Sequence, residues 1–110
     1  MNAYDLNEAS GVLAPSGAFV ITGHLRLLSV RAYGPMFAAA EAAMRHPNGQ
    51  LVIDLVGVEF MNSSAVTALS RLILRARAAT VRLTLRGNAS LHWHGVTLRA
   101  LGRLYPGAIV

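Results

Sequence analysis

The sequence contains no cysteine and no lysine, and only 6% of its 110 residues are aromatic. Without cysteine there can be no disulfide framework, no zinc–thiolate cluster and no cysteine nucleophile. No apolar run approaches the roughly 18 residues that a transmembrane helix needs. Residues 1–10 also lack the basic-then-apolar layout of a secretory signal peptide. We therefore expect a soluble, cytoplasmic protein that does not act at a membrane.

Acidic residues are missing from the second half of the chain. The last one is Glu59, so residues 60–110 carry seven arginines and a formal charge of +7, against −2 for residues 1–59. A basic half is typical of proteins that meet nucleic acid, an acidic membrane surface or an acidic protein partner. Solvated helix faces in an arginine-biased composition account for the same asymmetry equally well. The charge asymmetry alone therefore does not indicate which kind of partner the protein binds.

With 110 residues, 54% of them hydrophobic, the chain is long enough for one domain with a buried core and too short for two. Apolar periodicity and turn residues predict seven elements. In chain order they are a weak strand near Val12, a strand at 18–22, a helix at 36–45, a strand at 50–55, a helix from 62–64 to 77, a strand at 81–86 and a helix from Ser90 to about Leu104. Strands that alternate with helices predict an α/β domain with parallel neighbours in its sheet.

Apolar stripes at helical spacing predict which helix faces pack on the sheet. The predicted stripes are Tyr33, Phe37, Ala40 and Met44 on the first helix, Val66, Leu69, Leu72, Ile73 and Ala76 on the second, and Val96, Leu98, Leu101 and Leu104 on the third. Residues 46–49, His-Pro-Asn-Gly, are predicted to end the first helix and turn into the next strand.

The most informative stretch runs from residue 51 to residue 77. An apolar strand ends at Asp54-Leu55, residues 56–61 are predicted to be a short connection, and Asn62-Ser63-Ser64 immediately precede the second helix. A helix N-terminus has unpaired backbone amides and a partial positive charge, so it suits an anion such as a phosphate. Taken alone, these three residues also fit a plain helix cap.

Residues 53–65 read Ile-Asp-Leu-Val-Gly-Val-Glu-Phe-Met-Asn-Ser-Ser-Ala. They resemble the signature of the STAS (sulfate transporter and anti-sigma-factor antagonist) domain, in which a strand ending in Asp-Leu leads to Asp-Ser-Ser-Gly at a helix start. Residues 21–25 and 83–87 are similar to other strand ends of that family. The likeness covers roughly residues 18–104. It implies one STAS-like domain over residues 1–110, with a four- to five-stranded mixed sheet, about three to four helices and the order β-β-α-β-α-β-α.

The resemblance also implies a function. Family members of this size are regulators in bacterial partner-switching circuits and are not enzymes. The unphosphorylated protein binds a serine kinase of the histidine-kinase-like ATPase type, which also serves as an anti-sigma factor. The kinase phosphorylates the serine after the motif aspartate and is released, and a PP2C-type phosphatase reverses the reaction. By position the phosphoacceptor is Ser63, and no cofactor is implied.

The resemblance to STAS domains also implies a partner-binding surface around the phosphoacceptor, formed by Asp54, Asn62, Ser64 and Ala65. Arg71 and Arg75 would lie at the side of this surface. Two residues depart from the motif, because Asn62 stands where the family has aspartate and Ala65 where it has glycine. Asparagine caps a helix as well as aspartate does. The missing carboxylate nevertheless leaves two alternatives open, a phosphorylated switch and an interaction module that binds constitutively.

Other chemistries find less support in the sequence. A serine enzyme needs a base oriented by a third group, and none of the four histidines lies in a recognisable catalytic motif.

His92-Trp93-His94 has metal-like spacing, but residues two apart on a helix point away from each other. We therefore expect two surface histidines around a packed Trp93, and no metal. Nucleic-acid binding by the arginine-rich half is the other alternative, although the aromatics do not alternate with the arginines and no nucleic-acid-binding motif is present.

Overall fold

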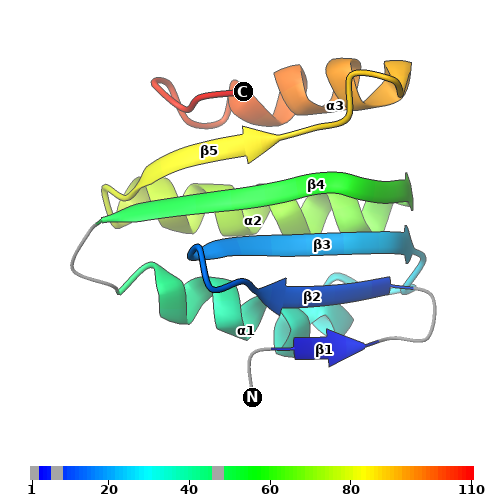
Figure 1. The fold of residues 1–110 in the computed structure, drawn as a ribbon, viewed down its shortest axis with the longest axis horizontal. Coiled ribbons are helices and arrows are strands. Elements are labelled where there is room, and N and C mark those ends of the chain that lie inside the picture. Colours follow the sequence, from blue (N-terminus) through cyan, green and yellow to red (C-terminus); the bar gives the residue numbers. More distant parts are fainter. Residues whose placement is uncertain (1–2, 6–8, 46–48) are drawn as a thin grey trace.

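The computed structural model describes residues 3–5, 9–45 and 49–110, and it forms a single layer of strands covered by helices (Figure 1). The strands are β1 (Ala3–Asp5), β2 (Ala9–Leu13), β3 (Ala18–Leu25), β4 (Gln50–Met61) and β5 (Arg82–Arg86). The helices are the 3-10 helix η1 (Val30–Tyr33), α1 (Gly34–Ala43), α2 (Ser63–Ala78) and α3 (His92–Gly102). In the parts of the chain so described, no helix is long and apolar enough to cross a membrane.

The five strands form one mixed sheet in the order β1-β2-β3-β4-β5. The pairs β1–β2 and β2–β3 are antiparallel, whereas β3–β4 and β4–β5 are parallel. Parallel neighbours need a crossover, and η1 with α1 supplies it for the first pair and α2 for the second. The predicted α/β domain with a mixed sheet and three α-helices is therefore confirmed. The predicted order lacks β1, a strand too short to show a period.

Apolar side chains of the helices and of one sheet face form the core. The stripe on α2 is confirmed, since Leu69, Leu72, Ile73 and Ala76 are all fully buried. On α3 the prediction is wrong for Val96, which is half exposed. The buried residues of α3 are His94, Leu98 and Leu101. Because these follow a spacing of four and three residues, Val96 lies on the opposite side of the helix.

Residues 56–61 were predicted to be a connection, and this prediction is wrong. They form the second half of β4. The register between β3 and β4 shifts twice, from the pair Val20–Asp54 to the pair Thr22–Gly57 and again after Gly23. Each shift is a β-bulge, which adds a residue to β4 and disturbs the alternation of its side chains. Val58 is fully buried as a result, although strict alternation from Leu51 would point it outward.

The start of α3 also differs from prediction. The helix begins at His92, its N-cap residue Leu91 makes no side-chain capping bond, and Ser90 donates its backbone N–H to the Asn88 side chain at 2.9 Å instead. The predicted Ser90 cap is therefore wrong. The first three residues of the predicted turn at 46–49 lie outside the described residues.

The chain end returns to the sheet beside β5. The Ile109 N–H donates to the Leu83 carbonyl at 2.9 Å, and the Ile109 carbonyl accepts from the Leu85 N–H at 2.7 Å. Tyr105 anchors this return, because its hydroxyl donates to the Val81 carbonyl at 2.7 Å. The outer edge of β5 is thereby partly paired within the chain.

Candidate interaction surface at the start of α2

The central strand β4 leads directly into the N-terminus of α2. Met61 ends the strand, Asn62 is the N-cap residue and Ser63 is the first residue of the helix. The neighbouring strand β3 ends at the same edge of the sheet, where the Asn62 N–H donates to the Leu25 carbonyl at 3.1 Å. Carboxyl ends of parallel strands are a frequent place for binding sites in open α/β sheets.

Both ends of the Asn62 side-chain amide are hydrogen bonded. The oxygen accepts from the Ala65 N–H at 2.9 Å and so caps α2. The nitrogen donates to the Leu27 carbonyl at 2.9 Å. An aspartate carboxylate has the acceptor but not the donor. Asparagine at this position therefore joins the helix start to the loop at residues 26–29, a link that aspartate does not provide.

Two further side chains hold the same loop. The Ser64 hydroxyl donates to the Leu28 carbonyl at 3.1 Å, and the Leu27 N–H donates to the Tyr33 hydroxyl oxygen at 3.0 Å. Tyr33 is fully buried and stacks on Phe37 with ring centroids 5.8 Å apart. Its burial raises its pKa above the ordinary 10.0, although the Leu27 hydrogen bond opposes this shift. The loop is thus fixed to both α2 and the core.

Ser63 differs from its two neighbours. Its side chain is exposed, and its hydroxyl has no hydrogen-bond partner among the described residues, whereas Asn62 and Ser64 are both engaged. Leu28, which the Ser64 bond holds next to this position, is 94% exposed. The free Ser63 hydroxyl is therefore followed in the chain by a serine that binds the backbone of an almost fully exposed leucine on a fixed loop.

The sequence prediction missed the exposed apolar side chains of this surface. Besides Leu28, Phe60 near the end of β4 is 43% exposed and lies under the Arg26 guanidinium, 5.3 Å from its carbon to the ring centroid. The only signal was that Leu25, Leu27 and Leu28 fit no helical or strand period. A break in periodicity of this kind marks a loop whose leucines do not all face the core.

Of the other predicted site residues, Ala65 and Asp54 do not present side chains beside Ser63. The Ala65 methyl is fully buried in the core, so this residue contributes only its N–H to the cap. Asp54 lies on the open face of the sheet, roughly 20 Å along β4 from its end. Its carboxylate accepts from the Val56 N–H at 3.0 Å and pairs with Arg86 at 3.5 Å.

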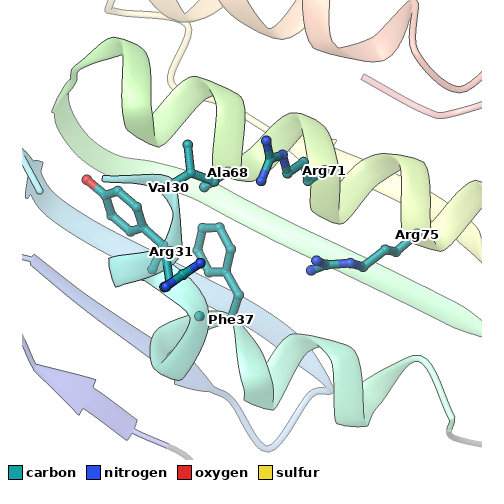
Figure 2. Close-up of a pocket in the computed structure, with 8 residues that line it drawn as sticks. Val30, Arg31, Phe37, Ala68, Arg71 and Arg75 are labelled. Atoms are coloured by element: carbon teal, nitrogen blue, oxygen red, sulfur yellow. The ribbon is translucent and has the colours of Figure 1, made fainter. Parts of the chain in front are cut away.

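Arg71 and Arg75 lie further along α2 than the serines. At 1.5 Å per residue, Arg71 is about 12 Å along the helix axis from Ser63. Both arginines line a cavity of about 280 Å³ between α2 and the segment formed by η1 and α1 (Figure 2). Arg75 also forms an ion pair with Glu41 of α1. The structure therefore places these two arginines in a separate pocket rather than around the serines.

The prediction that both histidines of residues 92–94 lie on the surface is wrong for His94, which is only 2% exposed. Its Nδ1 accepts from the Asn88 N–H at 2.9 Å, so its Nε2 is the atom that donates to the Val58 carbonyl at 2.7 Å. His94 thus ties α3 to the bulged part of β4. No group of three or more His, Cys, Asp or Glu side chains suited to a metal ion occurs among the described residues.

The arginines of the second half do not form one continuous basic stripe. Arg71 and Arg75 line the pocket, Arg82 and Arg86 are exposed on β5, Arg77 donates to the Leu104 carbonyl, and Arg99 and Arg103 lie on or after α3. Nucleic-acid binders usually gather such residues along one face or helix. This distribution favours several local roles over one extended nucleic-acid surface.

Comparison with protein-family models finds no match to this sequence, and a comparison with curated proteins finds none either. The resemblance to STAS domains therefore rests on the motif at residues 53–65 and on the order of strands and helices.

Proposed function

We propose that this protein is a non-enzymatic regulatory module that binds a protein partner, similar to the anti-sigma-factor antagonists of bacterial partner-switching circuits. Its binding surface is the start of α2 together with the loop at residues 26–29. One observation carries the proposal: the exposed Ser63 hydroxyl is free, while the residues on either side of it use their side chains to fix this surface.

The fixed loop favours protein binding for an entropic reason. Association is weakened when side chains and loops must be ordered in the complex. Here the Leu27 carbonyl and N–H and the Leu28 carbonyl are already hydrogen bonded, so the exposed Leu28 side chain is offered from a backbone that needs little further ordering. Leu28 is the apolar contact that we expect a partner to cover.

Phosphorylation of Ser63 would act through charge. It would add nearly two negative charges to a surface that the partner covers. Burying such a charge without a partner costs several kcal/mol, and each 1.4 kcal/mol lowers affinity about tenfold. The N-terminal amides of α2 favour a negative group, so the domain itself would stay folded. Release of the partner would then need no change of fold.

The proposed partner is a serine kinase of the histidine-kinase-like ATPase type, opposed by a PP2C-type phosphatase. The test is to incubate the protein with such a kinase from the same genome and ATP, and to locate the phosphate by mass spectrometry. Wild type and Thr67→Ala should be modified, and Ser63→Ala should not. Thr67 is a matched control because it is exposed one turn further along the same helix face. Modification of Thr67 in place of Ser63 would refute the assignment.

The release step has its own test. Ser63→Glu should weaken binding to the kinase at least tenfold. Ala42→Glu should leave it within about twofold, because it adds the same charge at an exposed site at the other end of the sheet. Equal affinity of Ser63→Glu and wild type would rule out the charge switch.

One observation favours a second candidate, a STAS-like module that binds without being phosphorylated. Asn62 removes the carboxylate that the motif carries, and its amide is already engaged in holding the loop. A stable complex with the kinase that shows no phosphate on Ser63 would support this candidate over the switch.

A further inference from the structure

A second polar feature lies between α2 and the segment formed by η1 and α1. It is a cavity of about 280 Å³, and three arginines line it: Arg31 from η1, and Arg71 and Arg75 from α2. Figure 2 shows Arg31 on one side of the groove and Arg71 and Arg75 on α2 at the other side. No sequence pattern groups Arg31 with the other two arginines, because it lies 40 residues before Arg71.

The charges around this pocket are not balanced. Arg75 pairs with Glu41, whereas neither Arg31 nor Arg71 makes an ion pair or a side-chain hydrogen bond within the described residues. Three guanidinium groups against one carboxylate leave a formal charge of +2. Like charges that share a partly enclosed space repel each other. A bound anion with two negative charges would remove this repulsion.

The pocket also has an apolar wall. Phe37 and Ala68 line it and are only 3% and 4% exposed. Arg31 is positioned by η1, whose last residue, Tyr33, is buried and stacked on Phe37. The Ser29 hydroxyl caps the same short helix by accepting from the Ala32 N–H at 3.2 Å. The three arginines are exposed, and they project from helices that are packed against the core rather than from a loop.

We propose that this pocket binds a small phosphate monoester. The planar guanidinium groups of Arg31 and Arg71 would each donate two hydrogen bonds to phosphate oxygens, and a short organic group would lie against Phe37. A dianion matches the charge of +2 better than a single carboxylate does. The volume lies close to the lower end of the range for small-molecule pockets, which favours a small soluble ligand over a peptide.

The binding test uses the complete protein with inorganic phosphate and with glycerol 3-phosphate as probes, at constant ionic strength with chloride as the reference. Binding is followed by the ¹H–¹⁵N NMR signals of η1 and of the arginine side chains. We expect saturable shifts that are larger for glycerol 3-phosphate than for phosphate. Arg31→Gln and Arg71→Gln should each weaken binding about tenfold, since a hydrogen bond to a charged group is lost.

Two matched controls separate the pocket from general charge. Arg103→Gln removes the same charge at the exposed end of α3 and should change the affinity less than about twofold. Glu41→Gln releases Arg75 and should tighten binding about two- to fivefold. Glu59→Gln should not, because Glu59 pairs with His24 away from the pocket.

Three results would overturn the proposal. The first is an absence of saturable shifts beyond those in chloride. The second is an Arg103→Gln variant that binds as weakly as Arg71→Gln, which would mean diffuse attraction. The third is saturable binding of a phosphoserine peptide without binding of glycerol 3-phosphate. None of these measurements involves Ser63 or a kinase, so their failure would leave the proposed partner-binding function untouched.

Discussion

The side-chain nitrogen of Asn62 donates to the carbonyl oxygen of Leu27 at 2.9 Å, across 35 residues of sequence. The oxygen of the same amide caps α2. A single planar group therefore sets the distance between the helix that carries Ser63 and the loop that carries Leu28. The proposed surface depends on an amide at this position and not only on a capping residue.

Two substitutions of Asn62 should measure how much each of its two side-chain hydrogen bonds contributes to stability. Asn62→Asp keeps the cap but loses the donor to Leu27, and we expect it to lower the free energy of unfolding by about 1 kcal/mol, with part of the loss offset by the helix dipole. Asn62→Ala loses both bonds and should cost about 2 kcal/mol. Urea denaturation measures both values. An aspartate variant as stable as wild type would show that the Leu27 bond contributes no net stability.

Ser63→Asp should affect stability and binding in opposite directions. A carboxylate at the first helical position interacts favourably with the N-terminal amides, so the free energy of unfolding should rise by about 0.5 kcal/mol. Ser63→Arg, the matched control of opposite charge, should lower it by a similar amount. Urea denaturation at low and high salt checks the mechanism, because salt should shrink both changes. A loss of stability in Ser63→Asp would mean that this helix start does not accept negative charge.

The two histidines at the start of α3 should respond very differently to the same substitution. His94→Leu leaves the partly buried Asn88 N–H and the buried Val58 carbonyl without their partner, so we expect a loss of about 2–4 kcal/mol in the free energy of unfolding. His92→Leu changes an exposed residue and should stay within about 0.5 kcal/mol of wild type. Thermal or urea unfolding of the pair is the measurement. Equal losses would argue against the buried bridge.

Alkaline pH should destabilise the protein through Tyr33. With no lysine or cysteine in the chain, tyrosines are the only side chains that change charge between about pH 9 and 12. Burial raises the Tyr33 pKa above 10.0, so the unfolded state ionises first. The stability from the neutral phenol is present below pH 10.0 and falls as the pH rises past it. Unfolding midpoints across this range should fall less steeply in Tyr33→Phe than in wild type, and equal slopes would contradict the assignment.

The sequence predicts those helices and strands whose burial pattern depends only on residues nearby in the chain. The α2 stripe from Leu69 to Ala76 repeats at helical spacing, and β5 alternates strictly, so both are legible in the sequence. The second half of β4 is not, because its bulges arise from pairing with β3. Gly57 faces Thr22 so closely that an added Cβ would come within 2.8 Å of the threonine methyl. That requirement comes from another strand and leaves no local pattern.

The candidate site also combines features that are local in the sequence with contacts between distant residues. The motif places Asn62, Ser63 and Ser64 at a helix start, because a strand end and a cap are local features. The loop partners of Asn62 and Ser64 lie 35 and 36 residues earlier, and the Val58 partner of His94 is also 36 residues away. Such contacts depend on how the crossovers bring the elements together. The exposure of Leu28 and the burial of His94 were therefore out of reach of the sequence alone.

The return of the chain at Ile109 bears on how separate molecules meet one another. An uncovered sheet edge offers unpaired N–H and carbonyl groups on which a strand of another copy can assemble. Ile109 forms hydrogen bonds with the Leu85 N–H and the Leu83 carbonyl on the outer side of β5. The exposed Arg82 and Arg86 add positive charge along the same strand. One residue close to the end of the chain thus helps to keep copies of this domain from adding to each other's sheets in concentrated solution.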